Sequence, residues 1–478
     1  PVSAGVQAYV GAQWGQVTPF AMVRPAPGAI YHDPGAVPAF GPALAPVLVD
    51  LIARESKMDP ARDETIDISP GAYGNNTLGT NDGHGHPVNP ATGAPYAPNV
   101  VQLDDFARVL AEFWADGPNS ETPPGFDAAL APVLVDLIAR EAKMAPDLDE
   151  TIDISPGAYG NNTLGTNDGH GHPVNPATGA PYAPNVVKVG DFARVLAEFW
   201  ADGPNSETPP GHWDTLANAV ADHPLHQRTL FGLGPAVDPL EWDVKVYFAL
   251  NAATHDAAIA AWEIKRRFAC GRPVSWIRYM ASLGQSSDPQ LASYNAGGLP
   301  LVPGLIELIT AASTQPGQRH AHLKRYLGQI AVRAWRGEPG DRKTEIGGVG
   351  WIRAAEWIPY QRRTFVTPAF PGFISGHSTF SRAGAEVLAG ITGDPAFPGG
   401  LGEYKAARNS YLVFERGPTA DVVLQWGTYD DAADQAGQSR LWGGIHIEPD
   451  DFAGRRIGSE IGLAALALAR TYYDGTAP

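Results

Sequence analysis

An internal duplication is the strongest constraint that this sequence places on the fold. Residues 44–125 return as residues 130–211, offset by 86 positions, and the copies differ at seven pairs of positions. Repeats of a solenoid keep their core positions and vary on the surface, whereas here loop-like stretches are also identical. The pattern indicates a recent tandem duplication or an assembly artefact, and it predicts that one copy is dispensable to the fold. The differing pairs are Ser56/Ala142, Asp59/Ala145, Ala61/Asp147, Arg62/Leu148, Gln102/Lys188, Leu103/Val189 and Asp104/Gly190.

Each copy has the pattern of two helices joined by a long loop. Apolar residues recur at helical spacing near both ends of each copy, and a stretch rich in Gly, Asn and Pro separates them. We therefore expect four parts in the chain. They are an N-terminal segment (1–43), the first copy (44–125), the second copy (130–211) and a helical core that carries the chemistry (212–478).

The C-terminal half also has helical periodicity, and few segments show the alternation of a strand. The predicted class is mainly α, with helices packed as a bundle. Asp243 is the expected N-cap of the first long helix, and Gly393 the expected end of a later one. The predicted helices are residues 243–269, 302–313, 320–335, 378–393 and 449–474.

The charge and the apolar runs exclude several classes of partner. The chain has 34 Lys and Arg against 51 Asp and Glu, a net charge of −17, so we expect no nucleic-acid partner. No apolar run reaches the ~18 residues of a membrane-spanning helix, so we expect a soluble protein without membrane insertion. Because the sequence begins at Pro1, we expect a truncated or processed product, with export and homo-oligomerisation left open.

Two short stretches of the C-terminal half pair cations with a helix start. Lys265 and Arg272 lie seven residues apart in KRRFACGRP, so both lie on one side of a helix if the helix continues that far. The triplet Ser375-Gly376-His377 precedes a predicted helix, whose first N–H groups favour an anion. Gly376 allows that anion to approach the backbone closely.

A third stretch, SRLWGGIHIEPD, adds Arg440, His446 and Asp450. The adjacent glycines at 443–444 break the helix, so Arg440 and His446 can both turn inward. Asp450 follows His446 by four residues and can orient its imidazole. A single Lys, Arg or His is more often a surface or structural residue, and it is the joint pattern that predicts an oxyanion pocket.

The three stretches resemble the family that unites vanadium-dependent haloperoxidases with PAP2-type acid phosphatases. The family pattern is Lys-x6-Arg-Pro, then Pro-Ser-Gly-His, then Ser-Arg-x5-His-x3-Asp. The first part is complete in Lys265–Pro273 and the third in Ser439–Asp450. The second departs from the pattern at Ile374, where Pro is usual, without losing a chemical group. The flanks GQVTPF, FWADGPNSETPPGHW and TFVTPAFPGF are similar to the bacterial haloperoxidase branch.

The resemblance implies a helical bundle of the vanadium haloperoxidase and PAP2 type, with vanadate as the cofactor. Ser375 and the N–H of Gly376 would hydrogen-bond the vanadate oxygens. His446 would bind the metal through a ring nitrogen, supported by Asp450, and His377 would be the acid–base group. Three cationic side chains would neutralise the equatorial oxygens: Lys265, Arg272 and Arg440.

Two aromatic residues are the candidates for a halide pocket. Trp262 lies three residues before Lys265 and Phe370 five before Ser375, as in fungal-type chloroperoxidases. Their ring edges carry partial positive charge and can border a halide, although core packing explains such residues equally well. The implied partners are hydrogen peroxide, a halide (bromide or chloride) and a small organic substrate.

The motifs leave the reaction open between two chemistries. A vanadate-dependent haloperoxidase would oxidise halide with peroxide to hypohalous acid and halogenate organic substrates, and this is the function we expect. In a PAP2-type acid phosphatase, His446 would be the nucleophile and His377 would protonate the leaving group. The third alternative is a catalytically silent scaffold that binds an oxyanion.

Overall fold

The computed structural model describes residues 10–11, 13–32, 34, 65–67, 100–102, 130–158, 171–201 and 206–477. The chain divides into two units, residues 37–120 and residues 1–36 with 121–478. In the smaller unit, β1 (Thr65–Asp67) pairs antiparallel with β2 (Val100–Gln102), with Ile66 opposite Val101.

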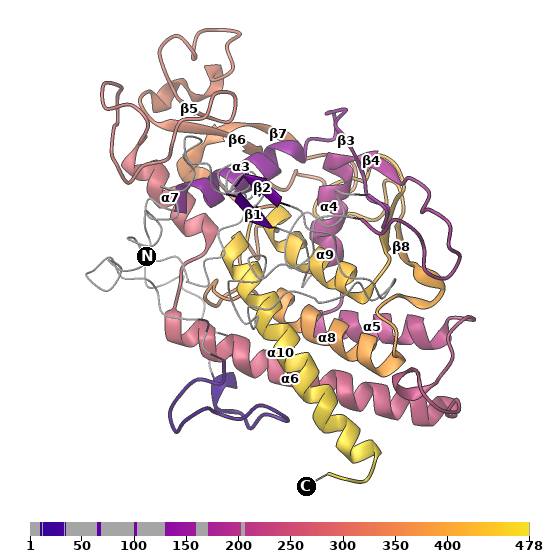
Figure 1. The fold of residues 1–478 in the computed structure, drawn as a ribbon. Coiled ribbons are helices and arrows are strands. Elements are labelled where there is room, and N and C mark those ends of the chain that lie inside the picture. The colour runs from indigo at the N-terminus through magenta and orange to yellow at the C-terminus, as the bar shows by residue number, and fades with distance from the viewer. Residues whose placement is uncertain are drawn as a thin grey trace. The chain divides into compact units, whose positions relative to one another are not determined.

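Four helices form the centre of the larger unit: α6 (Pro239–Phe268), α8 (Gly376–Thr392), α9 (Tyr429–Trp442) and α10 (Glu448–Tyr473). Helix α8 packs against the other three, and α10 crosses α6 (Figure 1). The shorter helix α5 (Pro209–Asp222) packs against α6 and α8, whereas α7 (Pro273–Leu283) packs against the 3-10 turn Ala354–Glu356. The prediction of a mainly α helical bundle is confirmed.

A stripe of glycines on α10 sets how closely α8 can approach it. Gly454, Gly458 and Gly462 are spaced four residues apart, so they share one face of the helix. A Cβ atom at any of them would lie within 2.7 Å of a carbonyl oxygen of α8 or of its N-cap, Ser375. The two backbones are therefore in direct contact, and this contact fixes the N-terminus of α8.

The first long helix begins earlier than the sequence pattern indicates and ends within one residue of the predicted end. Asp238, and not Asp243, is the N-cap, because its side chain accepts the N–H groups of Leu240 and Glu241. The helix stops at Ala269, which is left-handed with φ 47°. Arg272 consequently does not extend α6 and instead precedes α7 as its N-cap.

The second repeat copy is built into this unit. It supplies α3 (Ala131–Lys143), β3 (Thr151–Asp153), β4 (Val186–Lys188) and α4 (Val189–Phe199). The two helices match the predicted pattern, but the connecting loop also contains the antiparallel pair β3–β4. Every residue of α4 is buried, so this copy forms part of the hydrophobic core.

Two predicted helices, 302–313 and 320–335, are wrong. The segment contains β5 (Ile306–Leu308), β6 (Ile330–Trp335) and, further on, β7 (Val349–Arg353), which form a three-stranded antiparallel sheet. A second pair joins β8 (Gly402–Ala406) to β9 (Val422–Trp426). The described 3-10 turns are Trp14–Gln16, Leu230–Gly232, Ala321–Tyr326, Ala354–Glu356 and Pro398–Gly400.

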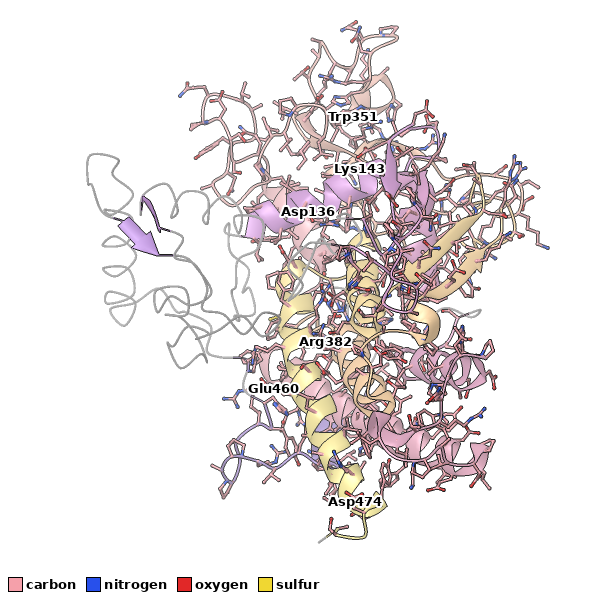
Figure 2. The ribbon with its side chains drawn as sticks, turned by 45° about the vertical axis from the view of Figure 1, so that its right-hand side comes forward. Asp136, Lys143, Trp351, Arg382, Glu460 and Asp474 are labelled. Atoms are coloured by element: carbon pink, nitrogen blue, oxygen red, sulfur yellow. The ribbon has the colours of Figure 1, made fainter. Side chains whose placement is uncertain are left out.

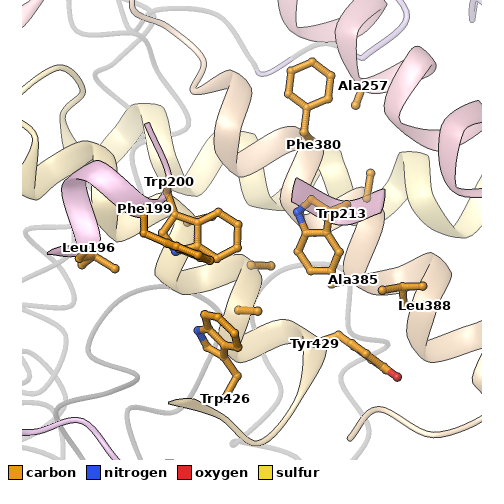
Figure 3. Close-up of a cluster of buried hydrophobic side chains, with 14 of the residues drawn as sticks. Leu196, Phe199, Trp200, Trp213, Ala257, Phe380, Ala385, Leu388, Trp426 and Tyr429 are labelled. Carbon is orange, nitrogen blue, oxygen red and sulfur yellow. The ribbon is translucent and has the colours of Figure 1, made fainter. Parts of the chain in front are cut away.

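Aromatic side chains from four elements fill the core beside the bundle (Figure 3). Trp200 follows α4, Trp213 lies on α5, Phe380 on α8 and Trp426 on β9, and all four are buried. The rings of Trp200 and Trp426 lie 6.1 Å apart, nearly edge to face. Burying each such ring contributes about 1.5–3 kcal/mol, so this cluster holds the second copy against α8.

Two carboxylates of α6 and one of α10 hold the N-terminal segment. The buried Asp256 accepts the backbone N–H groups of Phe20 at 2.6 Å and Ala21 at 2.8 Å. Glu263 accepts the N–H of Tyr31 at 2.9 Å, and His32 binds Glu460, which is labelled on α10 in Figure 2. Within the described residues, no helix is long and apolar enough to span a bilayer.

Candidate functional site

The N-terminus of α8 presents the predicted triplet at the centre of the bundle. Ser375 is the N-cap, and its Oγ accepts the N–H of Ser378 at 3.2 Å. Its own N–H donates to the carbonyl of Asp450 at 2.8 Å, which joins the start of α8 to the start of α10. The next N–H groups belong to the first helical turn and favour an anion.

His377 is held as a neutral imidazole with one nitrogen toward the cavity. Its Nε2 lies 2.6 Å from the carbonyl of Trp200, which is labelled in Figure 3. A carbonyl only accepts, so Nε2 carries the hydrogen and Nδ1 is left as an acceptor. Burial, together with the charge of Arg440, keeps the pKa of His377 well below its usual value. Arg440 donates to the same carbonyl at 3.1 Å, so Trp200 positions both side chains.

His446 is fixed in the opposite tautomer. Its Nδ1 lies 2.8 Å from Oδ2 of Asp450, and its Nε2 lies 2.9 Å from Nη1 of Arg272. Since the carboxylate only accepts and the guanidinium only donates, Nδ1 carries the hydrogen and Nε2 offers its lone pair. Burial and the charge of Arg272 hold the pKa of His446 well below its usual value. This tautomer is the one that a metal ligand or a nucleophile needs.

Lys265 is fully buried, and its ammonium group points at backbone carbonyls. Nζ donates to the carbonyls of Pro371 and Gly372, each at 2.9 Å, and to that of Ile374. Three acceptors match the three hydrogens of a charged lysine. Burial and the nearby Arg272 lower its pKa well below the usual value. Lys265 therefore holds the loop before Ser375 and adds a positive charge behind it.

Arg272 contributes the second buried cation. It donates to the carbonyls of Phe370 and Ile445 as well as to His446. Burial lowers its pKa to about 9, which leaves the guanidinium charged at neutral pH. Its Nη2 is buried and has no hydrogen-bond partner among the described residues. A buried N–H group without a partner is costly, and an oxyanion would satisfy it.

A cavity of about 490 Å³ opens onto this constellation. Six of the ten predicted site residues line it, and the other four lie one layer behind its wall. The contacts above join this second layer to the first, so the structure brings the sequence-predicted residues into one site. The lining six are Trp262, Phe370, Gly376, His377, Arg440 and His446, and those behind are Lys265, Arg272, Ser375 and Asp450.

The two aromatic candidates for the halide pocket lie side by side. The ring centroids of Trp262 and Phe370 are 4.8 Å apart, with planes tilted by 51°. Nζ of Lys265 lies 5.2 Å from the Phe370 centroid, and the guanidinium carbon of Arg272 lies 5.3 Å from it. The pair forms a cavity wall with two cations behind it, an environment that suits a weakly hydrated anion.

A buried charge network behind Ser375 is absent from the sequence prediction. Ser378 Oγ lies 2.6 Å from the carboxylate of Asp451 and 2.8 Å from Ser375 Oγ. Arg455 binds Asp451 and also Asp434, the latter at 2.7 Å. The carboxylate takes the hydrogen of Ser378, so Ser375 donates to Ser378. The acidic pair at 450–451 was the available signal, but nothing in the sequence shows that Asp451 is buried.

A family comparison covers the helical core of the chain. Residues 245–299 and 312–475 match the family model described as the VCPO second helical-bundle domain, and these ranges contain all ten predicted site residues. No curated protein matches the sequence.

Three solved structures are similar in part. A holo-type bacterial vanadium-dependent chloroperoxidase is 19% identical, with a TM-score of 0.39 over 59% of this chain and 44% of that one. Its apo-type form is 20% identical, with 0.40 over 60% and 46%. A bacterial vanadium-dependent iodoperoxidase is 19% identical, with 0.32 over 57% and 43%.

The chain thus spans less than half the length of these solved proteins. Residues 245–299 and 312–475 are thus similar to the VCPO second helical-bundle domain.

Proposed function

We propose that this protein is a vanadate-dependent haloperoxidase that oxidises halide with hydrogen peroxide and halogenates organic substrates. The observation that carries the proposal is the state of His446. Its Nε2 lone pair accepts a hydrogen bond from Arg272 Nη1, and its Nδ1 hydrogen is donated to Asp450. A neutral histidine held this way, next to buried cations, suits an oxyanion whose central atom accepts a nitrogen ligand.

The residues present fit vanadate. Arg272 offers the unpartnered Nη2, and Arg440 lines the cavity with its charge. Gly376 lines the cavity without a side chain, so its N–H can be reached. Ser375 can turn its hydroxyl from Ser378 to an oxyanion. Lys265 would act through its charge and through the loop that it holds, because its three hydrogens are already bound.

The chemistry then divides between cofactor and protein. Bound vanadate would supply a Lewis acid that activates hydrogen peroxide toward halide. His377 lines the cavity and would accept and return protons through Nδ1, because Nε2 stays on the Trp200 carbonyl. The balance consumes peroxide, halide and one proton and yields hypohalous acid and water. Trp262 and Phe370 would border the halide.

A PAP2-type phosphatase is the second candidate, favoured by the same lone pair. An unprotonated Nε2 on His446 is also what attack on a phosphate ester requires. His377 would then protonate the leaving group. An oxyanion pocket serves both reactions, because a five-coordinate vanadate resembles the transition state of phosphoryl transfer.

A paired assay on the purified chain tests the proposal. One arm follows bromination and chlorination of a dione dye with hydrogen peroxide after incubation with orthovanadate. The other follows p-nitrophenyl phosphate hydrolysis without vanadate. We expect halogenation that requires vanadate. Phosphate release that vanadate inhibits, with no halogenation, would establish the phosphatase, and vanadate binding with neither activity would leave the silent scaffold.

Replacing Asp450 tests the tautomer argument. Asp450→Ala removes the acceptor of the His446 Nδ1 hydrogen, and we expect vanadate affinity to fall by about 10–100-fold. Asp450→Asn keeps an acceptor oxygen and should cost less. Equilibrium dialysis with elemental analysis of vanadium measures both. Equal losses in the two variants would mean that the charge of Asp450, and not its hydrogen bond, supports His446.

A further inference from the structure

A chain of hydrogen bonds leads from Ser375 into the interior of the bundle. Ser375 Oγ lies 2.8 Å from Ser378 Oγ, which lies 2.6 Å from Oδ1 of Asp451. The Asp451 carboxylate also accepts hydrogen bonds from Nε and Nη2 of Arg455, at 2.9 Å and 2.8 Å. All four side chains are buried. The far end of the chain is therefore a carboxylate that accepts from both sides.

This carboxylate fixes the direction of both hydroxyl hydrogens. Ser378 has one hydroxyl hydrogen and donates it to Asp451, so the contact between the two serines requires that Ser375 is the donor. Ser375 Oγ also accepts the N–H of Ser378 at 3.2 Å, as the N-cap of α8. The single hydroxyl hydrogen of Ser375 is therefore directed into the interior, away from any ligand.

The position of Ser375 agrees with this direction. Gly376 and His377 line the cavity, whereas Ser375, the residue directly before them, is fully buried behind its wall. To donate to an oxyanion in the cavity, the Ser375 hydroxyl must turn away from Ser378 and give up that hydrogen bond. One net hydrogen bond between neutral groups changes an equilibrium constant by about two- to tenfold.

Close backbone contacts fix Ser378 and Asp451 in place. Gly454 of α10 has no side chain, and a Cβ atom there would lie 2.9 Å from Cβ of Ser378. Gly437 of α9 packs directly on the carboxylate of Asp451, where a Cβ atom would overlap with Oδ1. Interiors packed this closely leave side chains little room to shift. Ser378 therefore cannot follow Ser375 toward the cavity, and the hydrogen bond between them must break.

We propose that Ser378, oriented by Asp451, is a positioning residue that holds the Ser375 hydroxyl back from a bound oxyanion. The site binds an oxyanion less tightly than its donors allow, because part of the binding energy is used to break the hydrogen bond between the two serines. The inference rests on the oxyanion site of the proposed function, and it involves neither peroxide nor halide. Ser375 is the N-cap of α8 at all times and a donor to the oxyanion only at this cost.

Removing the acceptor of the Ser375 hydrogen tests the proposal. Ser378→Ala leaves Asp451 paired with Arg455 and frees the Ser375 hydroxyl. We expect orthovanadate, followed by equilibrium dialysis, and inorganic phosphate, followed by titration calorimetry, each to bind this variant about two- to tenfold more tightly. Ser378→Cys, whose thiol is a weak acceptor, should change both affinities in the same direction.

A double-mutant cycle shows whether the gain in affinity depends on Ser375. Adding Ser378→Ala to Ser375→Ala should leave both affinities unchanged, because no hydroxyl remains to be freed. Ser381→Ala is the matched control, since Ser381 lies one turn later on α8, is buried, and has no hydrogen-bond partner for its hydroxyl among the described residues. This control should bind both oxyanions like the unchanged chain.

Equal or weaker binding by both Ser378 variants, or a gain of the same size on the Ser375→Ala background, would overturn the inference and leave the proposed function standing. A chain that binds neither oxyanion would overturn the site itself, and with it both proposals. A gain that depends on Ser375, in a chain that does not halogenate, would support the inference and overturn the proposed reaction.

Discussion

Replacing His446 by alanine is expected to lower vanadate-dependent halogenation by at least about 10³-fold. The variant loses the one nitrogen that is held as a lone pair beside Arg272, so the oxyanion keeps its charge partners and loses its ligand. Single donors to a reacting oxyanion are worth about 10²–10³ in rate, and a ligand to the central atom contributes more. Initial rates of dione bromination at several vanadate concentrations measure the loss.

Replacing a second histidine, His377, distinguishes vanadate binding from catalytic turnover. His377→Ala should retain vanadate in equilibrium dialysis and lose turnover, because Nδ1 of His377 moves protons and does not ligate. His446→Ala should lose both. If His446→Ala bound vanadate with unchanged affinity, the assignment of His446 as the ligand would be wrong, whatever the remaining rate. His322→Ala serves as the control for histidine replacement away from the cavity.

The sequence predicted more of the candidate site than of the backbone elements that surround it. The glycines at 443–444 correctly indicated the helix break after which His446 lines the same cavity as Arg440. Lys265 and Arg272 lie close together as expected, but they do not share one helix. Helix α6 ends at Phe268, within one residue of the predicted end, and Arg272 reaches the site from the N-cap of α7.

The segment before α8 shows why periodicity failed elsewhere. Residues 330–335 (IAVRAW) satisfy a helical pattern, but five of the six are buried and pair as a central strand between β5 and β7. A short apolar run of this kind cannot be assigned to helix or strand by its period alone. Gly328, at φ 82°, ends the preceding turn and was the signal available for a strand start.

The positioning groups behind the site carry no sequence signature. His377 depends on the carbonyl of Trp200, and a carbonyl is present at every residue. Ser375 contacts Ser378, which is bound to Asp451 and through it to Arg455, and these two ions are buried together. Tertiary packing decides both, so a motif search recovers the residues that face the ligand and misses those that orient them.

Deleting one repeat copy is expected to give opposite results for the two copies. The variant lacking residues 44–129 joins Ala43 to Leu130, and the variant lacking residues 126–211 joins Gly125 to His212. The two products have equal length and differ only at the seven positions where the copies differ. We expect the first to keep its stability and its vanadate site, and the second to be strongly destabilised.

Two of the seven positions at which the copies differ explain why we expect the second deletion variant to be destabilised. Ala145 is 3% exposed and packs directly against Gly190, where a Cβ atom would lie 2.7 Å from the Ala145 carbonyl oxygen. The first copy has Asp59 and Asp104 at the corresponding positions. Fitted into the same place, it would bury two adjacent carboxyl groups. Overpacking costs about 1–3 kcal/mol and an unpaired buried polar group roughly 2–7 kcal/mol, out of a total stability of about 5–15 kcal/mol.

Chemical denaturation of both variants, with vanadate dialysis, measures the difference. We expect the variant that retains the first copy to lose at least about 4 kcal/mol of unfolding free energy, from the same two terms. Reverting Asp59→Ala and Asp104→Gly in that variant should restore most of the loss, while the five other differences should contribute little. Equal stability of the two deletion variants would show that either copy can fill this place. Failure of both would show that the duplication is part of the folded protein. Only selective failure, rescued by those two reversions, would mean that the sequence itself chooses which copy supplies the Trp200 carbonyl to His377.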